Sequence, residues 1–298
     1  MIELSENYAL ARLTTVRAGG AAELFARPGT IAELRELLAW ARGAGHAVSV
    51  VGSGSNLLIA DEGVPGLVLH FERELARIEQ VEGGLRCGGG ARLPAVAARS
   101  AALGLSGIEF GVNIPGTVGG AVRMNANAYD GSLAKILVWA QVVTAEEVEQ
   151  RTPDTLGFAY RSSSLRRDEF VAAARFSLES APPEAVRSTL ARMRALRHEA
   201  QPKGIKTFGS TFKNPPGATA GQLLAAAGAA GLRVGGARLS RKHANFVENV
   251  DGATTADIVA LMALARERVL EHAGIALERE VHALGPVSFP WEEQAGAG

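Results

Sequence analysis

Small residues gather between two apolar runs in the stretch Val48–Ile59, which reads Val-Ser-Val-Val-Gly-Ser-Gly-Ser-Asn-Leu-Leu-Ile. Its first residues predict a buried strand, and Gly52 and Gly54 then let the backbone approach a ligand closely. Successive N–H groups in such a loop can hold an anion, most often a phosphate. A tight hairpin built from small residues is the alternative. The candidate anion-binding residues are Gly52, Ser53, Gly54, Ser55, Asn56 and Leu57.

The spacing of this loop does not match the two common phosphate-binding motifs. Leu57 stands where the dinucleotide fingerprint has its third glycine, and no Gly-Lys-Ser/Thr of a Walker loop follows. The chain continues as an apolar run rather than an amphipathic helix. We therefore expect a phosphate to lie at a strand–loop–strand corner and not at a helix N-terminus.

A second unusual stretch, Gly107–Tyr129, carries many small residues and little net charge. Small residues over such a length indicate a backbone packed against something flat and large. The alternative is a Gly-rich packing corner between two sheets, since interior glycine often marks close backbone approach only.

Polar groups that could act on an anionic substrate lie further along the chain. Arginines and lysines predominate from Arg192 to Lys213 and would suit a diphosphate, although a solvated helix face explains them equally well. Ser210 lies in Gly209–Pro215 without the Gly-x-Ser-x-Gly elbow of a hydrolase, so a turn serine is the alternative. Glu278 and Glu280 alternate with His282 on the last predicted strand, Leu277–Leu284, where an exposed edge is the alternative. Arg161, which follows an aromatic residue, is by itself a surface residue or a stacked cation.

Composition excludes several classes of protein. The formal net charge of +0 disfavours a general nucleic-acid or membrane-surface binder. The single cysteine, Cys87, excludes an internal disulfide, and the scattered histidines offer no pair at metal-ligand spacing. No signal peptide is visible, and the apolar run Ile258–Ala265 is too short to span a bilayer. We expect a cytoplasmic protein without a metal site.

Helix signals divide the chain into three regions: 1–75 with a β-α-β pattern, 76–199, and 200–298. Thr30 with Glu33 predicts a capped helix, and Pro94 predicts the start of another. Further helices are expected over Pro183–His198, after Thr219 with Gln222, and from Thr255 to Gly274, with a loose tail over Pro290–Gly298.

Six motifs, in this order, resemble those of the UDP-N-acetylenolpyruvoylglucosamine reductase family, over about Thr14 to Gly285. They are Thr-Thr-x-Arg-x-Gly-Gly, Gly-Ser-Gly-Ser-Asn-Leu-Leu, Ile-Pro-Gly-Thr-Val-Gly-Gly, Tyr-Arg-x-Ser, Gly-Ser-x-Phe-Lys-Asn-Pro and Leu-Glu-x-Glu-Val. The chain is similar to the shorter form of the family, which carries Lys-His-Ala-Asn-Phe in its C-terminal part. One departure is Asn113, where the family pattern has glycine before Ile-Pro-Gly.

The resemblance implies an α+β fold: two FAD-binding subdomains of the vanillyl-alcohol-oxidase type, 1–75 and 76–199, and a C-terminal α/β substrate domain, 200–298. It implies non-covalent FAD with its pyrophosphate on Gly52–Leu57 and its isoalloxazine against Pro115, Gly116, Thr117, Gly119 and Gly120. NADPH would be the hydride donor.

The implied reaction reduces the enolpyruvyl group of UDP-N-acetylglucosamine-enolpyruvate to UDP-N-acetylmuramate for peptidoglycan. By the motif match, Arg161 and Glu280 polarise the substrate and Ser210 protonates its C2. Four further residues would hold the UDP-sugar: Lys213, Asn214, Gln222 and His243. A sugar or alcohol oxidase on the same fold and a nucleotide-sugar binding module without chemistry are the rival functions. We expect a monomer.

Overall fold

The computed structural model describes residues 3–202 and 204–293, and the chain folds into two compact units. Unit 1 combines Leu24–Ser53 and Gly66–Glu199 with the first residues of the chain. Unit 2 combines Asn7–Glu23 and Gly54–Pro65 with the chain from Ala200 onward. The division falls inside the first Gly-rich loop, between Ser53 and Gly54. We describe each unit by itself.

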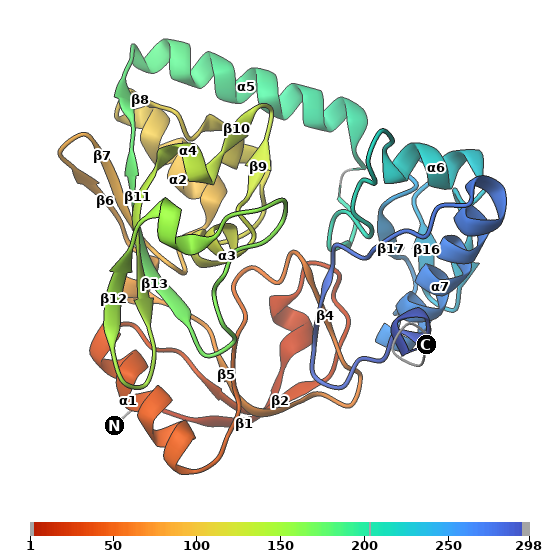
Figure 1. Ribbon diagram of the computed structural model, residues 1–298, viewed down its shortest axis with the longest axis horizontal. Helices are drawn as coiled ribbons and strands as arrows, with labels where there is room; N and C mark the ends of the chain where they lie inside the picture. The colour runs from red at the N-terminus through yellow and green to blue at the C-terminus, as the bar shows by residue number, and fades with distance from the viewer. Residues whose placement is uncertain (1–2, 203, 294–298) are drawn as a thin grey trace. The chain divides into compact units, whose positions relative to one another are not determined.

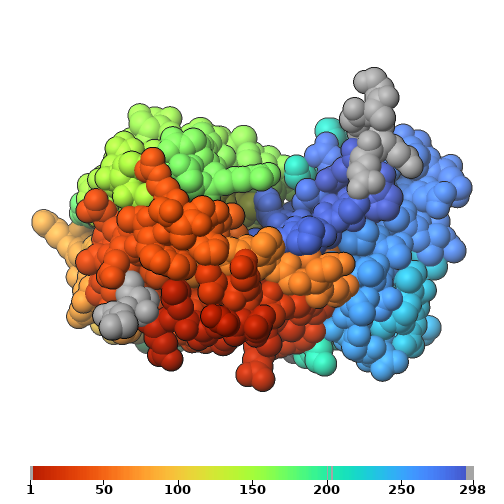
Figure 2. Space-filling view, turned by 90° about the horizontal axis from the view of Figure 1, so that it is seen from below, coloured from red at the N-terminus to blue at the C-terminus, as the bar shows by residue number. Residues whose placement is uncertain are grey.

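Helix α1 (Ile31–Gly43) covers the first sheet, as the sequence pattern predicts. The Thr30 side chain accepts a hydrogen bond from the Glu33 N–H at 3.1 Å and so begins the helix. The apolar face of α1 packs on strand β5 (Val64–Leu69). In Figure 2 the N-terminal part of the chain, which includes α1, is coloured red to orange at the surface. The sheet has the order β1-β2-β5-β3, with β3 parallel to β5, and its strands are β1 (Ser5–Ala9), β2 (Ala21–Ala26), β3 (Val48–Val50) and β5 (Val64–Leu69).

The second sheet of unit 1 is five-stranded and antiparallel, and helices α2 (Leu93–Ala102) and α3 (Val118–Arg123) pack against it (Figure 1). Its order is β12-β11-β13-β7-β6, and the strands are β6 (Ile78–Val81), β7 (Gly84–Gly88), β11 (Leu137–Val143), β12 (Val148–Arg151) and β13 (Phe170–Ser177). The long helix α5 lies over α2. The helices are α2 (Leu93–Ala102), α3 (Val118–Arg123), α4 (Leu133–Ile136) and α5 (Pro183–Ala200).

Two small strand pairs complete unit 1. They are β8 (Leu105–Ser106) with β14 (Glu179–Ser180), and β9 (Asn127–Ala128) with β10 (Gly131–Ser132). In the part of the chain that the structure describes, four 3-10 turns lie between the larger elements: Leu10–Leu13, Arg73–Ala76, Glu109–Asn113 and Pro153–Leu156. The turn Glu109–Asn113 leads directly into Ile-Pro-Gly.

Unit 2 is built around helix α7 (Thr255–Ala273), whose predicted apolar face is fully buried. A capping box of Thr254 and Asp257 begins this helix, and Gly274, with φ +68°, ends it. Besides α7, the unit contains β4 (Leu57–Ile59), α6 (Ala220–Ala226), β15 (Arg233–Val234), β16 (Ala237–Leu239), β17 (Val247–Asn249), β18 (His282–Leu284) and α8 (Pro290–Glu293).

Two predictions for the end of the chain need correction. The expected strand Leu277–Leu284 is regular only as β18 (His282–Leu284), which pairs in parallel with β4. Residues before it bond instead to the chain around Phe212, so the change of partner interrupts the ladder. The expected tail begins with α8, and its last part, 294–298, lies outside the described residues.

Candidate functional site

The first Gly-rich loop connects β3 to β4 and offers unused backbone donors. The N–H groups of Gly52 to Asn56 make no hydrogen bond to any residue that the structure describes. Ser53 Oγ is shielded from solvent and also has no partner in the described part of the chain. Unused amides in succession form an anion-binding concavity, so the loop fits the phosphate role that its sequence predicts.

The second Gly-rich stretch meets the first within unit 1. An ideal Cβ built on Gly52 would lie 2.5 Å from Oγ1 of Thr117. Thr117 itself is held because the N–H of Leu93 donates to the carbonyl oxygen of Gly116 at 3.0 Å. A Cβ on Gly119 would lie 3.1 Å from the backbone oxygen of Gly89. Glycine at positions 52 and 119 therefore permits close backbone packing, which places the two predicted flavin loops side by side.

Arg161 lies at the tip of a tight turn in unit 1. Ala159 and Ser162 exchange backbone hydrogen bonds of 3.1 and 3.3 Å, which leaves Tyr160 and Arg161 between them. Arg161 has φ +57°, a left-handed conformation that is uncommon for arginine. Its guanidinium lies 5.5 Å from the centroid of the Tyr160 ring, and Nη1 is 3.5 Å from Oδ1 of Asn127. Backbone strain of this kind gathers at functional sites.

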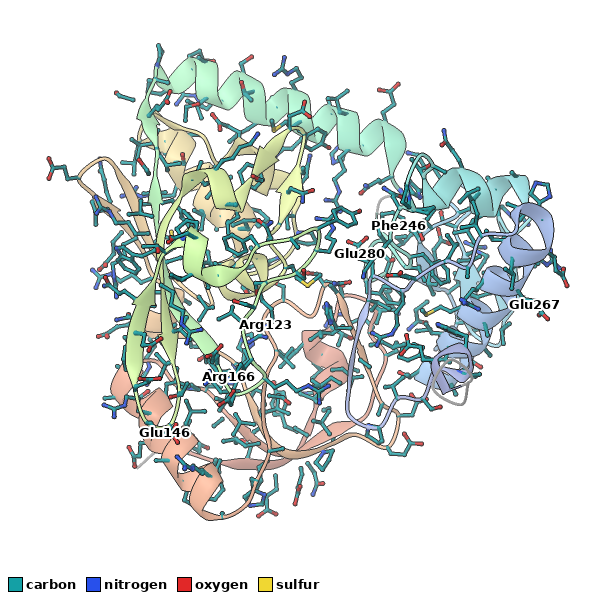
Figure 3. All side chains as sticks on the ribbon, viewed as in Figure 1. Arg123, Glu146, Arg166, Phe246, Glu267 and Glu280 are labelled. Carbon is teal, nitrogen blue, oxygen red and sulfur yellow. The ribbon has the colours of Figure 1, made fainter. Side chains whose placement is uncertain are left out.

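Arg123 connects helix α3 to the chain that follows Arg161. Its guanidinium donates to the backbone oxygens of Leu165 at 3.1 Å and Glu169 at 2.6 Å, and its own carbonyl accepts from Ser163 Oγ at 2.8 Å. Figure 3 labels Arg123 together with Arg166. Burial lowers the pKa of Arg123, while Glu169 opposes that shift. Arg123 is thus a structural cation rather than a substrate ligand.

Ser210 begins an extended segment of unit 2 that is held by Asn245. The N–H of Thr211 donates to the backbone oxygen of Asn245 at 2.8 Å, and the N–H of Phe212 donates to its Oδ1 at 2.9 Å. Asn245 Nδ2 returns a hydrogen bond of 2.8 Å to the Phe212 oxygen. The sequence reasoning gave Asn245 no role, although a polar residue between apolar Ala244 and Phe246 was a usable signal.

Glu280 lies on the neighbouring segment. Its N–H donates to the Thr211 carbonyl at 2.8 Å, next to Ser210. Its own carbonyl oxygen accepts from Asn56 Nδ2 at 3.2 Å. Figure 3 labels Glu280 and Phe246, which come from the two segments beside Ser210. The backbone thereby brings Ser210, Glu280 and the end of the first Gly-rich loop together within unit 2.

Gly209 gives the turn that leads into Ser210. It has φ +85°, a conformation that favours glycine. A Cβ built there would have the carbonyl oxygen of Ser55 as its nearest neighbour, at 3.9 Å. The serine-bearing turn therefore lies beside the Gly-rich loop.

Lys213 and Asn214 already have partners in unit 2. Lys213 Nζ pairs with Glu278 at 3.1 Å, a contact that the sequence reasoning missed. Asn214 Oδ1 accepts from the Ala220 N–H at 3.0 Å at the start of α6. Of the predicted basic stretch, Arg192 and Arg194 are exposed on α5 in unit 1, Lys206 is exposed in unit 2, and Lys203 lies outside the described residues.

Gln222 and His243 lie at helix α6. Gln222 is exposed, and its Oε1 accepts from Thr219 Oγ1 at 2.9 Å. The His243 ring packs on Gly221 and lies edge-on to Phe246, with 4.7 Å between ring centroids. Burial lowers the pKa of His243, so its imidazole is neutral at pH 7 and serves as a hydrogen-bonding group rather than a cation.

Among the described residues no group of His, Cys, Asp and Glu could hold a metal ion, and no helix there could cross a membrane. Cys87 is buried in the five-stranded sheet, and burial raises the pKa of its thiol to about 12. A protonated thiol is a poor nucleophile. Cys87 therefore gives no support for covalent attachment of a cofactor.

Two family models match the chain. "FAD binding domain" matches residues 22–152, which include both Gly-rich loops, and "UDP-N-acetylenolpyruvoylglucosamine reductase, C-terminal domain" matches 201–284, which include Ser210 and Glu280. A UDP-N-acetylenolpyruvoylglucosamine reductase from Heliobacterium modesticaldum is 40% identical over 93% of this chain and 89% of its own length. The chain belongs to the UDP-N-acetylenolpyruvoylglucosamine reductase family.

Other reductases of this family agree over nearly the whole chain. One from Lactobacillus delbrueckii subsp. bulgaricus is 41% identical and covers 95% of this chain and 96% of its own. The crystal structure of a reductase from Thermus caldophilus matches with a TM-score of 0.82 and 35% identity over 95% of this chain and 99% of that one. The predicted family, α+β fold and FAD cofactor are thus confirmed, and the protein is an FAD-dependent oxidoreductase.

Proposed function

We propose that the protein reduces the enolpyruvyl group of UDP-N-acetylglucosamine-enolpyruvate with NADPH, giving UDP-N-acetylmuramate for peptidoglycan precursor synthesis. Family membership supports the reaction class. The observation that carries the proposal is the backbone assembly that places Ser210 and Glu280 on adjacent segments beside the Gly-rich loop. The reaction needs a proton donor and polarising groups at the substrate, and an anion-binding loop for the FAD pyrophosphate.

Two loops would hold the cofactor. The unused amides of Gly52 to Asn56 would receive the FAD pyrophosphate, with Leu57 continuing into β4. The tightly packed backbone from Pro115 to Gly120 would present a flat surface to the isoalloxazine. Bound FAD supplies the hydride chemistry between NADPH and C3 of the enolpyruvyl group. The first loop fits this group by its unused amides, and the second by its close packing against Gly52.

Three side chains would perform the acid–base work. The enol ether is electron-rich, so its carboxylate must be polarised before C3 can accept a hydride. Arg161 would stabilise the enolate-like charge that develops, and Glu280 would assist as a hydrogen-bond donor when its carboxyl group carries a proton. Ser210 would then protonate C2, because a hydroxyl can act as an acid toward so basic a carbon.

Four residues of unit 2 would hold the UDP-sugar. Lys213 can turn from Glu278 to a diphosphate, since an exposed ion pair is worth only about 0–1 kcal/mol. Asn214 and Gln222 keep amide nitrogens that can donate to oxygen acceptors, and neutral His243 can donate or accept one hydrogen bond.

Several broader features belong to the same proposal. Residues 1–75, 76–199 and 200–298 would act as two FAD-binding subdomains and a substrate domain. We propose a monomer in the cytoplasm. We also propose that it binds no nucleic acid, because its formal net charge is +0.

The test is the visible spectrum followed by substrate-dependent NADPH consumption. Purified protein should absorb near ~450 nm, as protein-bound oxidised flavin does, and acid precipitation should release the colour. NADPH consumption should rise strongly on addition of UDP-N-acetylglucosamine-enolpyruvate. Faster turnover with dioxygen and a simple sugar would favour an oxidase, and a colourless protein that FAD cannot reconstitute would refute the proposal.

A further inference from the structure

Asn113 connects the second Gly-rich stretch to helix α5 and to the β9–β10 hairpin. Its side-chain nitrogen Nδ2 donates to the backbone oxygen of Met193 at 2.7 Å and to the hydroxyl of Tyr129 at 3.0 Å. Tyr129 Oη in turn lies 3.4 Å from the same Met193 oxygen. One amide group therefore ties three elements of unit 1 at a single point.

The elements around this point are themselves well packed. Val112, the residue before Asn113, is buried in a cluster with Val186 and Leu190 of α5, against which Met193 also packs. The 3-10 turn and α5 are thus joined by an apolar contact and, next to it, by the hydrogen bond from Asn113 to Met193.

The hairpin partner is fixed as well. Tyr129 and Asp130 have φ +51° and +63°, so the backbone of this turn holds two left-handed residues in succession. A Cβ built on the next residue, Gly131, would lie 2.5 Å from Cδ1 of Phe110 in the 3-10 turn. The Tyr129 hydroxyl therefore has a defined place from which to accept the Asn113 hydrogen bond.

The two ends of the loop that follows are anchored differently. Main-chain hydrogen bonds hold its second half, from the Gly119 N–H to the Gly89 oxygen at 2.7 Å and from the Leu93 N–H to the Gly116 oxygen at 3.0 Å. In its first half, the Ile114 N–H donates within the 3-10 turn to Gly111 at 3.1 Å, and Pro115 has no N–H to donate. The hydrogen bonds of the Asn113 side chain to Met193 and Tyr129 therefore hold the first half of the loop, where the backbone makes no such bond to another element among the described residues.

We propose that Asn113 is a positioning residue for the flavin, acting through Ile114 and Pro115 and supported by Tyr129 and the Met193 carbonyl. The inference rests on the proposed function, which places the isoalloxazine against Pro115–Gly120. The amide of Asn113 suits this task because it can donate to two acceptors at once. Its anchor would fix where Pro115 stands before FAD arrives, so less conformational freedom would be lost on binding.

The experiment compares Asn113→Asp with Tyr129→Phe and with Val186→Ala. Asn113→Asp keeps the shape of the side chain but places a carboxylate oxygen against the Met193 carbonyl, which cannot donate. Tyr129→Phe leaves the 2.7 Å hydrogen bond from Asn113 to Met193 in place. Val186→Ala loosens the same α5 packing at its far end, because Val186 is 2% exposed. Each apoprotein is titrated with FAD, and the absorption spectrum of each FAD complex is recorded.

For Asn113→Asp we expect the FAD dissociation constant to rise about tenfold, the scale of losing one or two hydrogen bonds, with a changed fine structure of the flavin band. Tyr129→Phe should raise it about threefold or less, and Val186→Ala should lower apoprotein stability with FAD affinity within about twofold of wild type. If Asn113→Asp does not fold, Asn113→Ala takes its place, because it removes the donor without adding charge. It should also raise the FAD dissociation constant about tenfold.

An Asn113 variant with wild-type FAD affinity and an unchanged spectrum would overturn the inference. So would a Val186→Ala variant that weakens FAD binding as much as Asn113→Asp, because general loosening of α5 would then explain both. Wild-type protein that binds no FAD would instead refute the proposed function, and the two failures are thereby distinguishable.

Discussion

Asn56 and Glu280 are joined by hydrogen bonding although 224 positions separate them. The Asn56 side chain donates to the Glu280 carbonyl at 3.2 Å, and its backbone oxygen accepts from the N–H of His282 at 3.1 Å. The last residues of the proposed anion-binding loop and the proposed catalytic glutamate are therefore joined in one backbone assembly. A disturbance of the loop should reach the substrate chemistry as well as the cofactor.

Asn56→Ala should slow the oxidation of reduced flavin by the enolpyruvyl substrate about fivefold at saturating FAD, because Glu280 loses a hydrogen bond worth about 1 kcal/mol that fixes its backbone. The matched control is Asn249→Ala, since Asn249 donates to the Val16 oxygen at 2.9 Å and accepts from the Ala253 N–H at 2.8 Å away from these residues. Asn249→Ala should lower thermal stability and leave the rate within about twofold. Stopped-flow absorbance and a melting curve measure both, and equal slowing in the two variants would contradict the account.

The helices could be predicted from sequence because their signals are local. Thr30 caps α1 through a residue three positions away, and the apolar periodicity of α7 follows from 3.6 residues per turn. The strand predicted over Leu277–Leu284 was wrong in its first half because that segment changes partner. No local pattern reveals which distant segments will bond to it.

The site residues could be proposed only by motif order. From spacing alone, Ser210 was equally well a turn serine and Glu280 a residue of an exposed edge. Neither suggests a catalytic role until the fold brings their two segments together. Two contacts were missed because the partners lie 33 and 65 positions apart: that of Asn245 with the Ser210 segment and that of Glu278 with Lys213. Tertiary contacts of this range follow from the whole fold and not from a window of sequence.

Gly52→Ala should raise the FAD dissociation constant at least about tenfold. Its Cβ would collide with Thr117, 2.5 Å away at Oγ1, and push the two Gly-rich loops apart. Gly43→Ala is the control, because a Cβ at the end of α1 meets nothing within 4 Å and should leave FAD affinity unchanged.

Adding Thr117→Ala to Gly52→Ala should restore part of the affinity, since the hydroxyl and methyl groups that collide are then gone. FAD titration of the three apoproteins measures the effect. Unchanged affinity in Gly52→Ala would show that the contact between the loops does not matter for the cofactor.

The stability of the protein should rise with pH through the titration of His243. Burial lowers its pKa in the folded protein, so the unfolded chain, with histidine near its ordinary value of about 6.5, binds the proton more readily. The stability from neutral His243 is therefore fully present above about pH 6.5 and is lost as pH falls through the folded pKa.

Urea unfolding between about pH 5 and 8 should give a shallower pH dependence for His243→Gln than for wild type. His272→Gln, at an exposed position of α7, is the matched control for the removal of a histidine. A His243→Gln variant with the same slope as wild type would show that this imidazole does not titrate differently on folding.

The central claim is that Ser210 donates the proton to C2 of the substrate, and Ser210→Ala tests it in the two half-reactions. Flavin reduction by NADPH should stay near the wild-type rate, because that step needs no proton at C2. Oxidation of the reduced flavin by UDP-N-acetylglucosamine-enolpyruvate should slow by at least ~10²-fold, the usual contribution of a positioned general acid, and Ser210→Cys should recover part of that rate. Stopped-flow absorbance separates the two steps. Equal slowing of both in Ser210→Ala would mean that the serine shapes the pocket or positions the flavin and is not the acid.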